Sequence, residues 1–112
     1  MYYIRKKFQI SAAHHLNLDY ESKCTSLHGH NWVIEVYLKS KQLDHNGMVF
    51  DFAKIKNDIS GYLDHGNLNE LLPDFNPTAE NIAKWICDSL GSKCYRVEVQ
   101  ESENNIAIYE ID

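Results

Sequence analysis

The stretch HGHNWVIEVYLK, residues 28–39, decides the fold class, because its apolar and polar side chains alternate. Successive side chains of a β-strand point to opposite faces of the sheet, so the alternation predicts a strand with one apolar face. That face would carry His28, His30, Trp32, Ile34, Val36 and Leu38. Two histidines therefore lie on the apolar side of this predicted strand.

The sequence upstream alternates in the same way and predicts a first strand that runs from Tyr3 to His14. Its apolar face would carry Phe8, Ile10, Ala12 and His14. His15 would point to the opposite side. A hairpin formed by the two strands would bring His14 towards the histidines of the second strand.

Downstream, the apolar period changes to that of a helix between Asp51 and Tyr62, where Asp51 is suited to cap the helix N-terminus. The stretch NPTAENIAKWICDSLG, residues 76–91, predicts a second helix. Thr78 would be its N-cap, and Gly91 would terminate it. Two helices thus follow the first pair of strands.

Alternation returns in CYRVEVQE, residues 94–101, and after the turn SENN it continues in IAIYEI, residues 106–111. One face of the third strand would carry Tyr95, Val97, Val99 and Glu101. The order β-β-α-α-β-β predicts an α+β fold, in which two helices cover one face of an antiparallel four-stranded sheet. Residues 1–112 would form a single domain. Its open sheet edges predict pairing with further copies of the chain.

Composition excludes several classes of function. The 112 residues carry a net charge of −5, and no stretch gathers Lys or Arg, so nonspecific nucleic-acid binding is not expected. No apolar run approaches the roughly 20 residues of a membrane-spanning helix, and the N-terminus lacks a signal-peptide core. Three cysteines without a C-x-x-C pair favour a reducing compartment, so a cytoplasmic protein is expected.

Histidines of the two predicted strands suggest a metal site. His28 and His30 are one residue apart and would project to the same side of a strand. Alone, such a pair is equally compatible with surface or core histidines, but His14 on a matching face favours a metal. Three neutral nitrogens and an open position suit a catalytic zinc, with Cys24 as an alternative fourth ligand.

Three further candidates surround this site. Asp64 and His65 could form a carboxylate–imidazole pair that moves protons, although capping of the helix end is an alternative. Glu101 should point inward and accept hydrogen bonds from a cation, from backbone amides or from a ligand, unless the strand end slips towards solvent. Cys24 is placed to become a base or nucleophile beside a metal, whereas Cys87 is expected to be buried and inert.

Six stretches together resemble the family of 6-pyruvoyl-tetrahydropterin synthases and 6-carboxytetrahydropterin synthases. They are FQISAAHHL, CTSLHGHNW, GMVFDF, LDHGNLN, NPTAENIA and VQES, in the order and approximate spacing of that family. The resemblance implies the tunnelling fold (T-fold), whose subunits join edge to edge into trimers that stack as hexamers. It implies zinc ligands at His14, His28 and His30, catalytic residues at Cys24, Asp64 and His65, and pterin contacts at Glu101 and Thr78.

The resemblance also implies an activity. The substrate would be 7,8-dihydroneopterin triphosphate, and the short chain favours the 6-carboxytetrahydropterin branch, a lyase of queuosine biosynthesis that releases triphosphate and acetaldehyde. The sister activity, which forms 6-pyruvoyl-tetrahydropterin, is an alternative. A pterin- or metal-binding module without turnover is a second alternative, of a different class.

Overall fold

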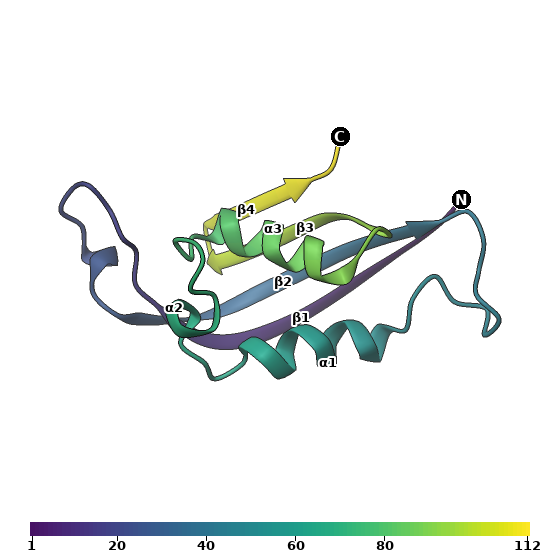
Figure 1. Cartoon of the computed structure of the whole chain (residues 1–112), viewed down its shortest axis with the longest axis horizontal. Coiled ribbons are helices and arrows are strands. Elements are labelled where there is room, and N and C mark those ends of the chain that lie inside the picture. Colours follow the sequence, from purple (N-terminus) through teal and green to yellow (C-terminus); the bar gives the residue numbers. More distant parts are fainter.

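The computed structural model describes residues 1–112 and contains one four-stranded antiparallel sheet. The strands are β1 (Tyr2–His14), β2 (His28–Ser40), β3 (Cys94–Ser102) and β4 (Asn105–Glu110). They lie in the sheet in the order of the sequence, and each pairs with the next (Figure 1). The predicted sheet is confirmed, and β1 and β4 are its two edges.

Two long helices connect the halves of the sheet, as predicted. They are α1 (Phe52–Leu63) and α3 (Ala79–Leu90). The side chain of Asp51 caps α1 by accepting a hydrogen bond from the Ala53 amide, and Gly91 ends α3 with a φ of +91° that favours glycine. Two short elements were not predicted, α2 (Leu68–Leu71) and a 3₁₀ turn (Lys23–Thr25), because they are too short to show a period.

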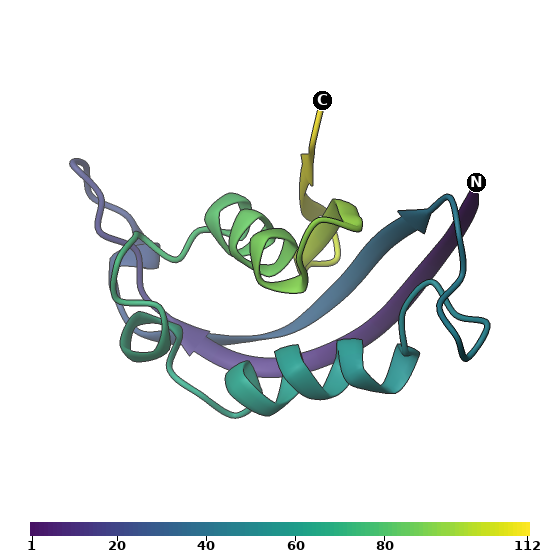
Figure 2. The same ribbon diagram turned by 45° about the vertical axis from the view of Figure 1, so that its right-hand side comes forward.

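Both long helices contribute to one hydrophobic core with the sheet. The α1 helix runs along β1, and α3 lies over β3 and β4 (Figure 1). The 22 apolar residues of this core include Ile55 and Ile59 from α1 and Ile86 from α3. Figure 2 shows that β1 and β2 are curved along their length, and that the segment joining them projects at one end of the molecule. The histidines of β1 and β2 lie at that end, where the two strands pair.

One predicted side-chain direction in β3 is wrong. A β-bulge shifts the register so that Arg96 pairs with Tyr37 while Cys94 pairs with Leu38. Tyr95 is the extra residue, and its ring packs edge-on against Tyr3 instead of joining the core. Cys94, with a fully buried side chain, takes the core position. A bulge of this kind reverses the alternation on one side of it.

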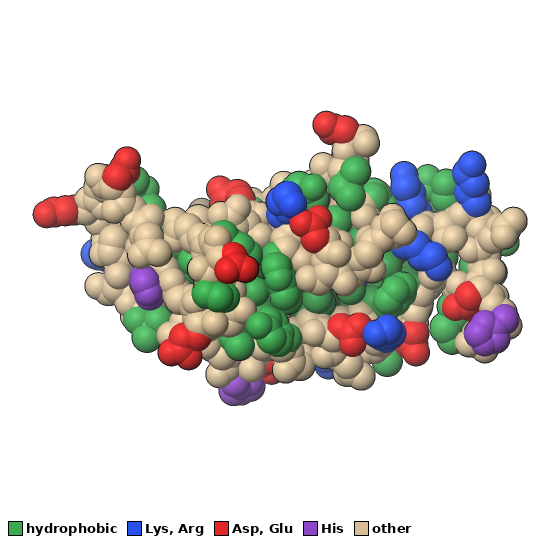
Figure 3. All heavy atoms as spheres, viewed as in Figure 1, with side chains coloured by type: hydrophobic (Ala, Val, Ile, Leu, Met, Phe, Trp, Pro, Cys, Tyr) green, Lys and Arg blue, Asp and Glu red, His purple; other side chains and the backbone are tan.

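Acidic and basic side chains are interspersed on the face of the molecule that carries the helices (Figure 3). Apolar side chains fill the space between them over the middle of this face (Figure 3). No helix is both long enough and apolar enough to cross a membrane.

Candidate metal centre and active site

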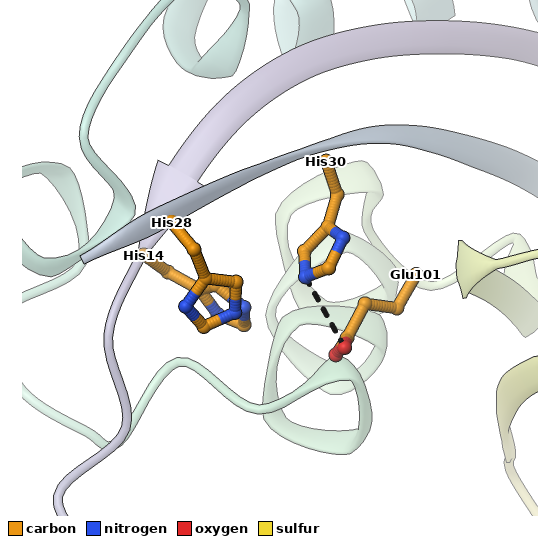
Figure 4. Close-up of side chains that lie close together, drawn as sticks. All are labelled: His14, His28, His30 and Glu101. Carbon is orange, nitrogen blue, oxygen red and sulfur yellow. Dashed lines mark ion pairs between the residues drawn. The ribbon is translucent and has the colours of Figure 1, made fainter. Parts of the chain in front are cut away.

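Three histidines meet where β1 ends and β2 begins (Figure 4). His14 and His28 are direct partners across the antiparallel pair, and His30 follows two residues later on the same face of β2. Their ring centres are 4.6 Å apart for His14 and His28, 4.8 Å for His28 and His30, and 5.4 Å for His14 and His30. Strand register alone therefore brings the three imidazoles together.

Backbone carbonyls orient two of these rings. His14 Nδ1 lies 2.8 Å from the Pro77 carbonyl oxygen, and His28 Nδ1 lies 2.7 Å from that of Ser26. Because a carbonyl only accepts, each Nδ1 carries the proton and donates it. The Nε2 atoms are then left with a free lone pair, which is how histidine ligands of a metal are usually held.

Unpaired buried nitrogens show that these residues fit a metal ion. The Nε2 atoms of His14 and His30 are buried and have no hydrogen-bond partner in the protein. A buried polar atom without a partner costs about 1–3 kcal/mol, so native proteins rarely keep one without a function. Burial also lowers the pKa of His14 below its usual 6.5, against the opposing hydrogen bond to Pro77. The neutral imidazole that a metal requires is thus favoured.

Glu101 reaches the same point from β3 (Figure 4). Its Oε1 lies 3.3 Å from His30 Nε2, and its side chain is 23% exposed. One ligand atom from each of His14, His28, His30 and Glu101 lies within 4.8 Å of the other three. The structure therefore groups four candidate ligands, and the fourth is this carboxylate and not Cys24.

Trp32 supports the group and was not predicted to take part. Its ring lies 4.8 Å from that of His14 and 5.3 Å from that of His30, and 1% of the residue is exposed. The indole Nε1 donates to the Ala12 carbonyl at 3.1 Å, which fixes the ring against β1. The signal was present in the sequence, because Trp32 continues the alternation of the two histidines on β2.

Asp64 and His65 lie together, but at the free edge of β1. Asp64 Oδ1 accepts the Ser11 amide at 2.8 Å, and Oδ2 lies 3.1 Å from His65 Nδ1. The hydrogen bond from Ser11, aided by His65, holds the pKa of Asp64 below its usual value. His65 has a φ of +62° and an 83% exposed side chain. Asp64 is also the C-cap of α1, so the capping role and the pairing with His65 occur together.

Cys24 lies in the 3₁₀ turn between β1 and β2 and is partly exposed. Its carbonyl accepts the Leu16 amide at 2.7 Å, which fastens this turn to the end of β1. The other two cysteines are buried, and burial raises the pKa of Cys87 and raises that of Cys94 to about 12. Cys24 is therefore the one cysteine accessible to a substrate.

Two pockets flank the candidate residues. One of about 500 Å³ is lined by Glu101 and by the start of α3, at Ala79 and Glu80, together with the β3–β4 turn. Another of about 370 Å³ lies beside His65, Gly29 and Asn31. Thr78 does not line either pocket; its Oγ1 accepts the Asn81 amide at 3.1 Å and caps α3, as predicted.

Comparison with known proteins shows the family. The family model for 6-pyruvoyl tetrahydropterin synthase matches residues 3–112. The chain belongs to this family of pterin synthases, which confirms the resemblance and the prediction of an enzyme of the lyase type.

Relatives with both activities are similar to the chain. A 6-carboxy-5,6,7,8-tetrahydropterin synthase from Synechocystis is 37% identical and covers 97% of this chain and 93% of its own. A 6-pyruvoyl tetrahydrobiopterin synthase from Dictyostelium discoideum is 34% identical over 78% of this chain and 73% of its own. The structure of the Caenorhabditis elegans 6-pyruvoyl tetrahydropterin synthase, 29% identical, matches with a TM-score of 0.77 over 99% of this chain and 96% of that one. The T-fold is thereby confirmed.

Proposed function

We propose that the chain is a zinc-dependent 6-carboxy-5,6,7,8-tetrahydropterin synthase of queuosine biosynthesis, active as one domain over residues 1–112. It would convert 7,8-dihydroneopterin triphosphate and water into 6-carboxytetrahydropterin, acetaldehyde and triphosphate. One observation carries the proposal: one ring nitrogen from each of three histidines and an oxygen of Glu101 lie within 4.8 Å of one another in a chain of this family. The 6-carboxy product is favoured because several of the similar relatives carry that name.

Substrate recognition would rest on Glu101. A carboxylate accepts two parallel hydrogen bonds, and the 2-amino group and N3–H of a pterin offer two parallel donors. The 500 Å³ pocket beside Glu101 has room for a bicyclic ring and is lined by Ala79, Ile106 and Ala107, which offer apolar surface. Thr78 would contribute by holding the first turn of α3 at this pocket.

His14, His28 and His30 would hold the zinc ion. When bound, zinc would polarise the side-chain hydroxyls of the substrate and lower their pKa. Pro77 and Ser26 would keep the first two imidazoles in the correct tautomer through their carbonyls. Trp32 would exclude water from the apolar side of the centre, where it is almost fully buried.

Proton transfer is assigned to Cys24, with His65 oriented by Asp64. Within one chain, the latter two residues lie at the free edge of β1 and are not members of the group of four candidate ligands. A homo-oligomer, as a trimer or a hexamer of two trimers, would place this edge beside β4 of a neighbouring copy. The complete site would then combine residues of two subunits, and no nucleic acid or membrane is part of it.

Incubation of the purified protein with 7,8-dihydroneopterin triphosphate tests the proposal. Mass spectrometry should find 6-carboxytetrahydropterin and acetaldehyde. Finding 6-pyruvoyl-tetrahydropterin instead would assign the sister activity, which the Dictyostelium relative represents.

A binding module without turnover is the second candidate, since Cys24 and His65 do not join the metal group within one chain. Wild type and Cys24→Ala would then be equally inactive while both still bound the pterin. Turnover that is lost only in Cys24→Ala would support the enzyme and the assigned role of the thiol.

A further inference from the structure

The outer edge of β1 is already occupied over part of its length. The Ser11 amide donates to Asp64 Oδ1 at 2.8 Å, and the Ser11 carbonyl accepts the His65 amide at 2.6 Å. The Ala13 amide donates to the Gly66 carbonyl at 3.0 Å. Because backbone groups alternate between the two sides of a strand, the outward groups still free for pairing belong to Tyr3, Arg5, Lys7 and Gln9. A further strand can therefore pair with β1 only before Ser11.

The outer edge of β4 offers a matching strand. The Ile111 amide donates to the Tyr95 carbonyl at 2.9 Å, so the backbone groups of even-numbered residues in β4 point away from β3. These residues are Ile106, Ile108 and Glu110, and both isoleucines are 53% exposed. An edge strand with exposed apolar side chains is a typical site of pairing with another chain. The β1 and β4 strands are opposite edges of the sheet (Figure 1), so the strand that meets β1 comes from a second copy.

Ring symmetry determines the direction of this pairing. Neighbouring strands of the sheet are all antiparallel, so β4 runs opposite to β1. Copies that are related by rotation about an axis along the strands all keep β1 in the same direction. The β4 strand of one copy therefore meets β1 of the next as an antiparallel strand.

Charge and the occupied part of the edge together select one register. Glu110 Oε1 accepts a hydrogen bond from Arg96 at 2.9 Å, and its second oxygen can accept from Arg5 of the next copy if the two residues lie opposite each other. A shift of β4 by one hydrogen-bonded pair towards the end of β1 would put Ile106 opposite Ser11, whose backbone groups are occupied. A shift the other way would separate Glu110 from Arg5. Both observations thus favour the register with Glu110 opposite Arg5.

An apolar pocket lies where this register ends. Its volume is about 340 Å³, and it is formed by the start of β1 and the segment that leads into α1. Its apolar lining includes Tyr3, Ile4, Leu43, Met48, Phe50 and Phe52. In the selected register, Ile111 lies opposite Ile4. Because Ile4 and Tyr109 both pack against the core, Ile111, which follows Tyr109 by two residues, points to the same face of the sheet as the pocket.

From these contacts we propose that the pocket at the start of β1 receives the side chain of Ile111 from a neighbouring copy, and that segment 64–67 is the stop that sets the register. The inference rests on the homo-oligomer of the proposed function. Ile111 is 50% exposed within one chain, and the aromatic and aliphatic lining of the pocket would cover it.

The same register has a consequence at the other end of β1. Beyond Ile106, the neighbouring copy continues into its β3–β4 turn, where Asn104 and Asn105 line the pocket beside Glu101. This turn would lie next to Ser11, which holds Asp64 and His65. Docking of Ile111 therefore also sets the position of the Asp64–His65 pair against the Glu101 pocket of the next copy.

Engineered disulfides test the register, because two cysteines form a disulfide only when their Cα atoms lie about 4.4–6.8 Å apart. Ile4→Cys is combined with Ile111→Cys in a Cys24→Ser background, in which the two remaining native cysteines are buried. The matched control combines Tyr2→Cys with Ile111→Cys, which would cross-link only after a shift of β4 by one hydrogen-bonded pair. Oxidised glutathione is the oxidant, and it is reduced to glutathione as the two protein thiols join. Nonreducing electrophoresis then separates the linked chains.

The Ile4–Ile111 variant should give covalently linked oligomers, and the Tyr2–Ile111 variant should stay unlinked. As a second measurement, light scattering over a dilution series compares wild type with Ile111→Asp. This change should weaken association about tenfold or more, because a buried apolar side chain is replaced by a charge. Asp112→Asn, at the neighbouring exposed residue, is the control and should associate like wild type.

Cross-linking of the Tyr2–Ile111 variant in place of the Ile4–Ile111 variant would overturn the inference. Absence of cross-links in both variants, or unchanged association of Ile111→Asp, would overturn it as well. If Ile4→Cys does not fold, Ile111→Asp decides. A monomeric wild type would overturn the homo-oligomer and the inference together, whereas zinc content and product formation test the metal centre and the activity independently.

Discussion

Replacing Thr78 by Ala should destabilise the protein, and the structure sets the size of the effect. The side chain contributes one helix-capping hydrogen bond, from the Asn81 amide to Oγ1 at 3.1 Å. Loss of such a cap costs about 1 kcal/mol. With an unfolding entropy of about 2 cal/mol/K per residue, a chain of this length should lose about 4 °C in Tm. Thr78→Ser keeps the hydroxyl and should restore most of this loss.

The same change should weaken metal binding, because the cap adjoins Pro77, whose carbonyl orients His14. Thermal unfolding is followed by circular dichroism at fixed protein concentration, once with a chelator and once with zinc, to separate the two effects. Ser89→Ala is the control at the other end of α3, where the hydroxyl bonds back to the Trp85 carbonyl of the same helix. An unchanged Tm in Thr78→Ala would refute the reasoning. A raised KM in Thr78→Ser, with normal stability, would indicate that the methyl group contacts the pterin.

Two further predictions concern the metal and the edge of β1. His28→Ala should lower metal affinity by about tenfold or more, so that metal analysis finds far less zinc per chain. The control His45→Ala, in an exposed loop, should retain the zinc content of wild type. Undiminished zinc in His28→Ala would refute the assignment of His28 as a ligand. Asp64→Asn should lower the free energy of unfolding at pH 7, because the carboxylate accepts the Ser11 amide. The pKa of Asp64 in the folded protein lies below its usual value of 3.8. The stabilisation is therefore complete at a pH above 3.8, the value of the unfolded chain, and is lost as the pH falls through the lower pKa of the folded protein. Urea unfolding should therefore show a difference from wild type that shrinks below about pH 4; a constant difference would contradict this.

The sequence was sufficient to predict the features that follow from periodicity. Alternation in residues 28–39 assigned His28 and His30 to one face of β2, and the hairpin register then placed His14 opposite His28. Caps predicted both helix starts, at Asp51 and Thr78, because a side-chain acceptor just before an apolar stripe is a local signal. These features need no knowledge of how the sheet and helices pack.

What the sequence could not predict depends on contacts between distant segments. The position of the Asp64–His65 pair is set by the hydrogen bonds from the Ser11 amide to Asp64 and from the His65 amide to the Ser11 carbonyl at 2.6 Å. The sequence LDHGNLN, residues 63–69, contains no local signal that predicts that this loop runs along the free edge of β1. The sequence therefore identified a plausible pair but could not show that this pair lies outside the group of candidate ligands within one chain.

The two bulges of β3 show why side-chain alternation is an incomplete guide to a site. Alternation assigns faces only while the register holds, and each bulge adds one residue that the pattern does not count. At the first bulge the prediction for Tyr95 failed, and Cys94 took its place in the core. At the second, Glu101 still reaches the histidines, although it lies outside the regular ladder. The alternation of Val97, Val99 and Glu101 predicted the inward direction of Glu101, although the regular pairing of β3 with β4 is interrupted at this residue. The carboxylate is positioned by the bulge and the adjoining turn, which depend on the pairing of β3 with β4 and not on the local alternation.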